Sequence, residues 1–145
     1  MARKTILLVE DNPEDEAHTL RTLKENNILN EVVVAHDGLE ALDYLWGQSA
    51  YADRDVRDQP QVVLLDLKLP KMSGLEVLQR LHADERTKHL PIIILTSSSE
   101  EPDILRSDET GANSYAHKPV DFSELTEAMR QLGLDWSILS DASSP

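Results

Sequence analysis

Polar residues of types that can do chemistry stand at the ends of short apolar runs in this 145-residue chain. In chain order they are Glu10 and Asp11, Asp66, Thr96 and Lys118. A carboxylate buried at the end of an apolar run costs several kcal/mol unless a cation pairs with it. Carboxylates brought close together also raise one another's pKa, so they stay ionised only beside positive charge. A divalent cation and a lysine would supply that charge.

The chemistry these residues favour is phosphoryl transfer. Oxygen ligation by a few carboxylates suits Mg²⁺, which keeps several waters and accepts phosphate oxygens. A carboxylate can attack phosphorus and form an acyl phosphate. The developing charge then needs the metal, an ammonium and a hydroxyl, and Lys118 and Thr96 are of these types. Each residue alone has an ordinary structural alternative, such as a turn cap for Asp66, so only the joint placement is specific.

The elements that must position these residues are short strands alternating with amphipathic helices. Strands are predicted at Thr5–Val9, Glu31–Ala35, Val62–Leu65, Ile92–Leu95 and Asn113–Ala116. The third and fourth of these runs do not alternate with polar residues, which is typical of strands buried on both faces of a parallel sheet. Strict alternation of five strands with five helices predicts a doubly wound α/β domain. The carboxyl ends of its strands share one edge, where α/β folds place their binding sites.

Helix starts are visible in the sequence. Asn12 followed by Pro13 predicts an N-cap and a first-turn proline, with acidic residues following at the positive end of the helix dipole. Three further starts show the capping-box pattern: Asp37 to Glu40, Ser73 to Glu76, and Asp121 to Glu124. A further helix, the fourth in chain order, is predicted to begin at Ser98 or Ser99, with Pro102 in its first turn.

Composition excludes several function classes. With 27 acidic and 14 basic residues the formal charge is −13, so the surface repels phosphate backbones and nucleic-acid binding is not expected. The absence of cysteine excludes disulfides, thiol nucleophiles and Cys-ligated metal sites. The histidines have no metal-ligand spacing, and none is predicted to be a phosphodonor: His18, His36, His82, His89 and His117.

We expect residues 1–145 to form a single domain with a core at about 4–133 and a short C-terminal extension, 134–145, that leaves no room for an output domain. The N-terminal apolar run is too short for a signal peptide or membrane span, so a cytoplasmic, soluble protein is expected. The long segment 48–60 is predicted to be either a solvated insertion or an element that docks a partner.

The site residues and their surroundings resemble the response-regulator receiver domains of two-component signalling. The matching stretches are Ile6–Asn12, Leu65–Pro70 with Gly74, Ile94–Ser97 and Tyr115–Pro119. The resemblance covers roughly residues 4–133 and implies a flavodoxin-like fold with strand order 2-1-3-4-5. Glu10 departs from the pair of adjacent aspartates that many receivers have, but it offers the same kind of oxygen ligand.

The resemblance also implies a role for each site residue. Asp66 is the implied phosphoacceptor. The implied Mg²⁺ ligands are Glu10, Asp11, Asp66 and the backbone carbonyl of Lys68. Such a domain catalyses only its own phosphorylation and dephosphorylation, so it is not expected to be an enzyme, and the donor histidine belongs to a sensor histidine kinase.

The remaining implied roles concern switching. Thr96 would bond a phosphoryl oxygen and Tyr115 would move inward with it, while Lys118 would contact the phosphoryl group and precede a cis bond to Pro119. The result would be a population shift that remodels a protein-binding face around residues 100–135.

A narrower likeness is to the phytochrome-associated response regulators of cyanobacteria. It rests on the long loop that follows Leu42–Trp46, the stretch Ser97–Ile104, and a C-terminal extension bearing Trp136. This likeness implies a bilin phytochrome kinase as donor and a homodimer formed through the face of the fourth helix, fifth strand and fifth helix.

Two alternatives compete with the phosphoacceptor hypothesis. A phosphatase of the haloacid dehalogenase type would need a second acid two residues after Asp66, where this chain has Lys68, and would also need a cap domain. A receiver-like interaction module that is never phosphorylated is the other alternative. The intact set of Asp11, Asp66, Thr96 and Lys118 argues against it.

Overall fold

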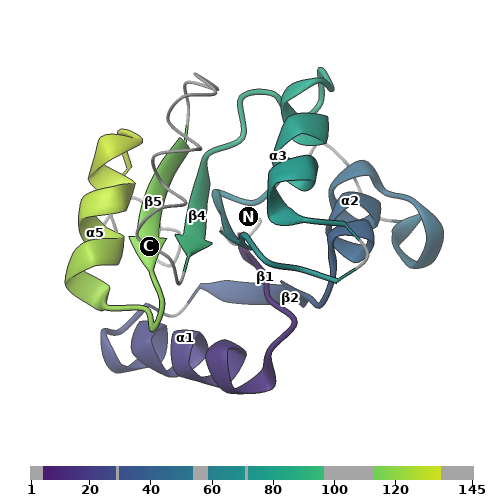
Figure 1. The fold of residues 1–145 in the computed structure, drawn as a ribbon. Coiled ribbons are helices and arrows are strands. Elements are labelled where there is room, and N and C mark those ends of the chain that lie inside the picture. Colours follow the sequence, from purple (N-terminus) through teal and green to yellow (C-terminus); the bar gives the residue numbers. More distant parts are fainter. Residues whose placement is uncertain (1–4, 29, 54–58, 71, 97–112, 135–145) are drawn as a thin grey trace, which may run out of the picture.

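The computed structural model describes residues 5–28, 30–53, 59–70, 72–96 and 113–134. Its single sheet contains β1 Thr5–Val9, β2 Glu31–Ala35, β3 Val62–Asp66, β4 Ile92–Thr96 and β5 Asn113–His117. All neighbouring strands are parallel, and the order is β2-β1-β3-β4-β5 (Figure 1). The predicted doubly wound sheet and its strand order are therefore confirmed.

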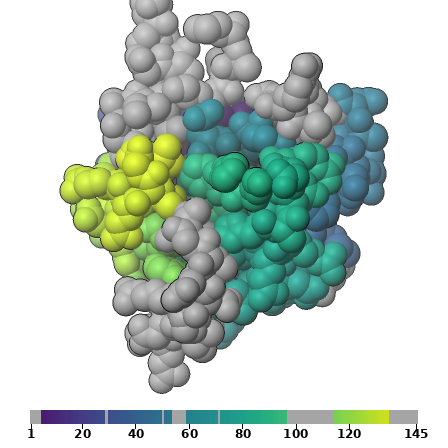
Figure 2. Space-filling view, turned by 90° about the horizontal axis from the view of Figure 1, so that it is seen from above, coloured from purple at the N-terminus to yellow at the C-terminus, as the bar shows by residue number. Residues whose placement is uncertain are grey.

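The described helices are α1 Pro13–Glu25, α2 Gly38–Trp46, α3 Gly74–His82 and α5 Phe122–Gln131, with a short 3₁₀ helix, η1, at Ser49–Tyr51. The predicted helix that begins near Ser98 lies outside the described residues. Seen from above, α5 and α2 lie at opposite sides of the molecule with α3 between them (Figure 2). None of these helices is long and apolar enough to span a membrane.

The central strands β1, β3 and β4 are buried on both faces, which explains their unbroken apolar runs. Leu7 and Val9 belong to the hydrophobic cluster that includes the apolar residues of α2 and α3. Ile6 and Leu8 belong to the other cluster, with Leu23 of α1 and the apolar residues of α5. Because both side-chain directions meet a helix layer, polar alternation would bury unpaired groups.

Most predicted helix starts are confirmed. Oδ1 of Asn12 accepts hydrogen bonds from the backbone N–H groups of Glu14 and Asp15, at 2.8 and 3.1 Å. The side chains of Asp37 and Ser73 likewise accept from the backbone N–H three residues on. The Asn12 cap fixes the N-terminal end of α1, and this end lies at the edge of the sheet where the site residues gather.

The helix start predicted at Asp121 is confirmed, because Asp121 is the N-cap of α5, but the capping box predicted there is wrong. The side chain of Asp121 makes no capping hydrogen bond. The carboxylate of Glu124 instead accepts from the backbone N–H of His117 at 3.0 Å and lies 2.6 Å from its Nδ1. A contact with the end of β5 has therefore replaced the local one.

Candidate functional site

Three of the predicted acids meet at the carboxyl edge of the sheet. Oxygen atoms of Glu10, Asp11 and Asp66 all lie within 4.8 Å of one another. Glu10 follows β1 and is fully buried, Asp66 ends β3 with 3% of its surface exposed, and Asp11 is exposed. The cluster is thus closed on the protein side and open to solvent at Asp11.

Burial acts directly on the charge of Glu10. Desolvation is the largest cause that raises the pKa of Glu10, to about 7, followed by a hydrogen bond and charge repulsion with Asp66. The charge of Lys118 and the backbone N–H of Asn12, 3.2 Å from Oε2, act in the opposite direction. Glu10 therefore needs more positive charge than Lys118 supplies if its carboxylate is to be fully ionised at neutral pH.

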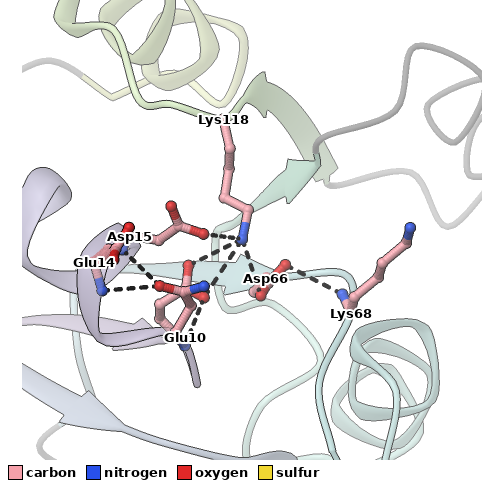
Figure 3. A network of polar contacts seen from close by, with 7 residues as sticks. Glu10, Glu14, Asp15, Asp66, Lys68 and Lys118 are labelled. Carbon is pink, nitrogen blue, oxygen red and sulfur yellow. Dashed lines mark hydrogen bonds and ion pairs between the residues drawn. The ribbon is translucent and has the colours of Figure 1, made fainter.

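Lys118 is the cation that the structure places among these acids (Figure 3). Its Nζ lies 3.1 Å from Oδ2 of Asp66, 3.3 Å from Oε1 of Glu10 and 2.9 Å from Oδ2 of Asp15. Desolvation acts to lower the pKa of Lys118, but the hydrogen bond to Asp15 and the charges of Asp66 and Glu10 outweigh it, so the pKa lies above its ordinary value. The ammonium is therefore charged throughout the physiological pH range.

Backbone hydrogen bonds between neighbouring strands fix the positions from which Lys118, Asp66 and Thr96 extend. The N–H of Lys118 donates to the carbonyl of Thr96 at 2.8 Å, and the bond between Lys118 and Pro119 is cis, as expected. β3, β4 and β5 each run one residue beyond their predicted ends. The ladder between β3 and β4 continues to this edge, where the N–H of Leu67 donates to the carbonyl of Leu95 at 3.0 Å. Asp66 and Thr96 are thus the last residues of their strands.

The turn after β3 is compact. The N–H of Lys68 donates to Oδ1 of Asp66 at 3.2 Å, while the Lys68 side chain extends away from the acids (Figure 3). The N–H of Gly74 donates to the carbonyl of Leu67 at 2.9 Å. A Cβ atom on Gly74 would clash with the carbonyl oxygen of Asp66, so this close approach requires glycine.

The two predicted switch residues lie on the neighbouring strands β4 and β5. Thr96 is 1% exposed at the end of β4 and is in register with His117 of β5. Tyr115 is partly buried and packs against the hydrophobic cluster shared by the sheet, α2 and α3. Their predicted movements remain predictions.

The donor set fits a hard divalent cation. Among the described residues, this acidic group is the only cluster with metal-ligand geometry, and it contains no histidine. A set of carboxylate oxygens that is partly open to water suits Mg²⁺ or Mn²⁺ better than metals that favour nitrogen or sulfur. A pocket of about 340 Å³ lies elsewhere, beside Gln61, Arg86 and His89, and is lined by none of these acids.

Sequence reasoning missed one residue of the site. In the sequence, Asp15 is one of the acids in the first turn of α1, which favour the helix dipole. Its contact with Lys118 is the shortest that the ammonium makes to any of the acids. The available signal was its position one helical turn after Asp11, on the helix that begins at the functional edge.

A five-stranded parallel sheet that gathers buried acids, a threonine and a lysine at its carboxyl edge defines a receiver-type signalling domain. The chain belongs to the response regulator receiver domain family, whose sequence pattern it matches over residues 6–130. The fold and the arrangement of the site agree with that membership.

Several relatives are regulators associated with phytochromes. Response regulator Rcp1 of Synechocystis sp. is 34% identical over 92% of this chain and 88% of its own length. The bacteriophytochrome response regulator AtBRR is 49% identical with a TM-score of 0.88, and the match covers 94% and 96% of the two chains. The phosphorylated cyanobacterial phytochrome response regulator RcpA is 35% identical with a TM-score of 0.71, and the match covers 97% of this chain and 91% of RcpA. The expected likeness to cyanobacterial regulators is confirmed and extends to bacteriophytochrome regulators.

Receiver domains bind a divalent metal, and the acidic cluster of this chain agrees with that property. One structure of Rcp1 is its Mn²⁺-bound form; Rcp1 in that form is 32% identical to this chain with a TM-score of 0.70, over 97% and 92% of the two chains.

Proposed function

We propose that this chain is a stand-alone response regulator that accepts a phosphoryl group from a histidine kinase onto Asp66, with Mg²⁺ as cofactor. The observation that supports this most is the position of Asp66 between two other acids and Lys118, whose Nζ lies 3.1 Å from it. The matches cover nearly the full length of Rcp1 and AtBRR, at 88% and 96%, which supports a regulator without an output domain.

In the proposed reaction, a carboxylate oxygen of Asp66 attacks the phosphorus of a phosphohistidine. An O–P bond forms, the P–N bond breaks, and the imidazole leaves with its electron pair. Mg²⁺ bound by Glu10, Asp11, Asp66 and the carbonyl of Lys68 would neutralise charge on the phosphoryl oxygens. This chain performs these steps only on itself, so we propose that it is not an enzyme.

Two further residues would hold the transferred group. The ammonium of Lys118 is placed to pair with a phosphoryl oxygen, and the hydroxyl of Thr96 would donate to another. Movement of Thr96 would leave space for Tyr115 to pack further inward. The phosphoryl group would thus favour one of two conformers of the protein-binding face.

We propose a bilin phytochrome-type sensor kinase as the donor, on the strength of the likeness to AtBRR, RcpA and Rcp1. We also propose a homodimer through the face formed by the fourth helix, β5 and α5, although that fourth helix lies outside the described residues. A cytoplasmic location without nucleic-acid or membrane partners completes the proposal and agrees with the charge of −13.

The test is incubation with Mg²⁺ and a small acyl-phosphate donor, followed by intact-mass measurement and size-exclusion chromatography. We expect one phosphate adduct that depends on Mg²⁺ and is absent from Asp66→Asn, with a shift towards dimer. A folded, metal-binding protein that forms no adduct would contradict the proposal and favour the unphosphorylated interaction module.

A further inference from the structure

Asp15 contacts the site but has none of the roles assigned so far. Its Oδ2 lies 2.9 Å from Nζ of Lys118, and its side chain is 34% exposed. Figure 3 shows Asp15 reaching the ammonium from the start of α1, on a different side from Asp66. Asp15 is not part of the group of acids with metal-ligand geometry.

The ammonium of Lys118 is shared between two kinds of acid. An ammonium has three N–H donors, and here it faces Asp15, Asp66 and Glu10 at 2.9, 3.1 and 3.3 Å. Glu10 and Asp66 belong to the metal-binding group, so a lysine that pairs with them competes with a cation for the same oxygens. Asp15 is the only one of the three partners that draws the ammonium away from those oxygens.

We propose that Asp15 is a positioning residue that competes with Glu10 and Asp66 for the Lys118 ammonium, so that a divalent cation displaces the ammonium from their oxygens more easily and binds more tightly. The inference rests on the metal site of the proposed function. It also gives Lys118 a fixed partner that does not change when a cation occupies the acids. The ammonium then stays at the sheet edge, where a phosphoryl oxygen would meet it.

The competing explanation is general: any acid in the first turn of α1 favours the helix dipole and adds negative potential. Glu14 lies in the same turn and is exposed, so it provides a matched control for both effects. The specific role of Asp15 differs because it depends on Lys118.

The test is titration of the purified protein with Mn²⁺, with free ion measured by electron paramagnetic resonance and no phosphodonor present. Asp15→Asn should weaken Mn²⁺ binding by about five-fold, as a part-buried ion pair of about 1 kcal/mol would. Asp15→Glu should restore most of the affinity, and Glu14→Gln should leave it unchanged.

The same substitution in a Lys118→Met background isolates the proposed coupling. Asp15→Asn should change the affinity little there, because no ammonium remains to compete. An equal loss in both backgrounds, or no loss in either, would overturn the role of Asp15. Failure of the unmodified protein to bind Mn²⁺ would overturn the metal site itself, whereas missing phosphorylation with normal binding would affect only the proposed function.

Discussion

The ammonium of Lys118 lies 3.1 Å from Oδ2 of Asp66, and these two groups are 13% and 4% exposed. Lys118 arrives from the end of β5 and Asp66 from the end of β3, so only the folded sheet edge brings them together. Three acids within 4.8 Å of one another depend on this lysine or on a metal for compensation. Stability and metal binding are therefore coupled at this site.

Lys118→Ala should lower the free energy of unfolding by about 2 kcal/mol in the presence of a chelator, because buried carboxylates lose their counter-ion. Saturating Mg²⁺ should recover most of that loss, since the metal replaces the missing charge. Urea denaturation under both conditions checks this. Lys88→Ala, which removes only the exposed pair with Glu85, is the control. An identical deficit with and without Mg²⁺ would argue against the coupling.

Gly74→Ala should destabilise the fold by about 2–3 kcal/mol and weaken Mg²⁺ binding, because the added methyl group pushes against the carbonyl of Asp66. Gly133→Ala is the comparison: its φ of +77° disfavours alanine, but nothing lies within 4 Å of the added atom. It should cost about 1 kcal/mol and leave metal affinity unchanged. Equal metal affinity in both variants would show that the turn after β3 does not position the site.

Tyr51→Phe should loosen the start of the 48–60 segment. The Tyr51 hydroxyl donates to Oε2 of Glu40 at 3.0 Å, and its ring meets that of Tyr44 edge-on with centroids 5.2 Å apart. Phenylalanine keeps the ring contact, so the loss should be about 1 kcal/mol, from the hydrogen bond alone. Faster amide exchange at residues 48–53, with unchanged phosphorylation, is the expected result; unchanged exchange would count against anchoring by Tyr51.

Asp84 gives a prediction for acid pH. Its side-chain hydrogen bond with Arg86, followed by the Arg86 backbone N–H, lowers the pKa of Asp84 from 3.8 to about 2. Because the pKa of Asp84 is lower in the folded protein than in the unfolded chain, the ionised carboxylate stabilises the fold at pH values above about 4. This stabilisation is lost as the pH falls from about 4 towards about 2. Because the pair is partly exposed, we expect Asp84→Asn to cost only about 1 kcal/mol at neutral pH.

The difference in the free energy of unfolding between Asp84→Asn and the unmodified protein should shrink as the pH falls from about 4 towards about 2. Urea denaturation at several pH values would measure it. Glu85→Gln, on an 86% exposed side chain, serves as the control and should show no comparable trend. A difference that stays constant down to about pH 2 would mean that the charge of Asp84 is not responsible.

Sequence was sufficient for features that depend on local or repeating patterns. The unbroken apolar runs predict strands buried on both faces, and Asn12 before Pro13 predicts the observed cap of α1. Convergence of Glu10 and Asp66 follows from parallel topology, because strand ends share an edge.

Features that depend on competition between partners were not predictable in the same way. Glu124 fits a capping box, yet it bonds His117, a residue brought to it by the fold. Asp15 has a sufficient local explanation at the start of α1, and only its position one helical turn after Asp11 separates it from Glu14 in the sequence. In both cases the side chain has a local partner available, and tertiary distances decide which contact forms.

The most direct test of the central claim is to find which residue carries the phosphoryl group. The protein would be treated with a small acyl-phosphate donor and Mg²⁺, reduced with borohydride to convert an aspartyl phosphate into homoserine, and analysed by peptide mass mapping. We predict conversion at Asp66 alone, lost when Mg²⁺ is chelated. Conversion at another carboxylate, or none in a folded and metal-bound protein, would contradict the account.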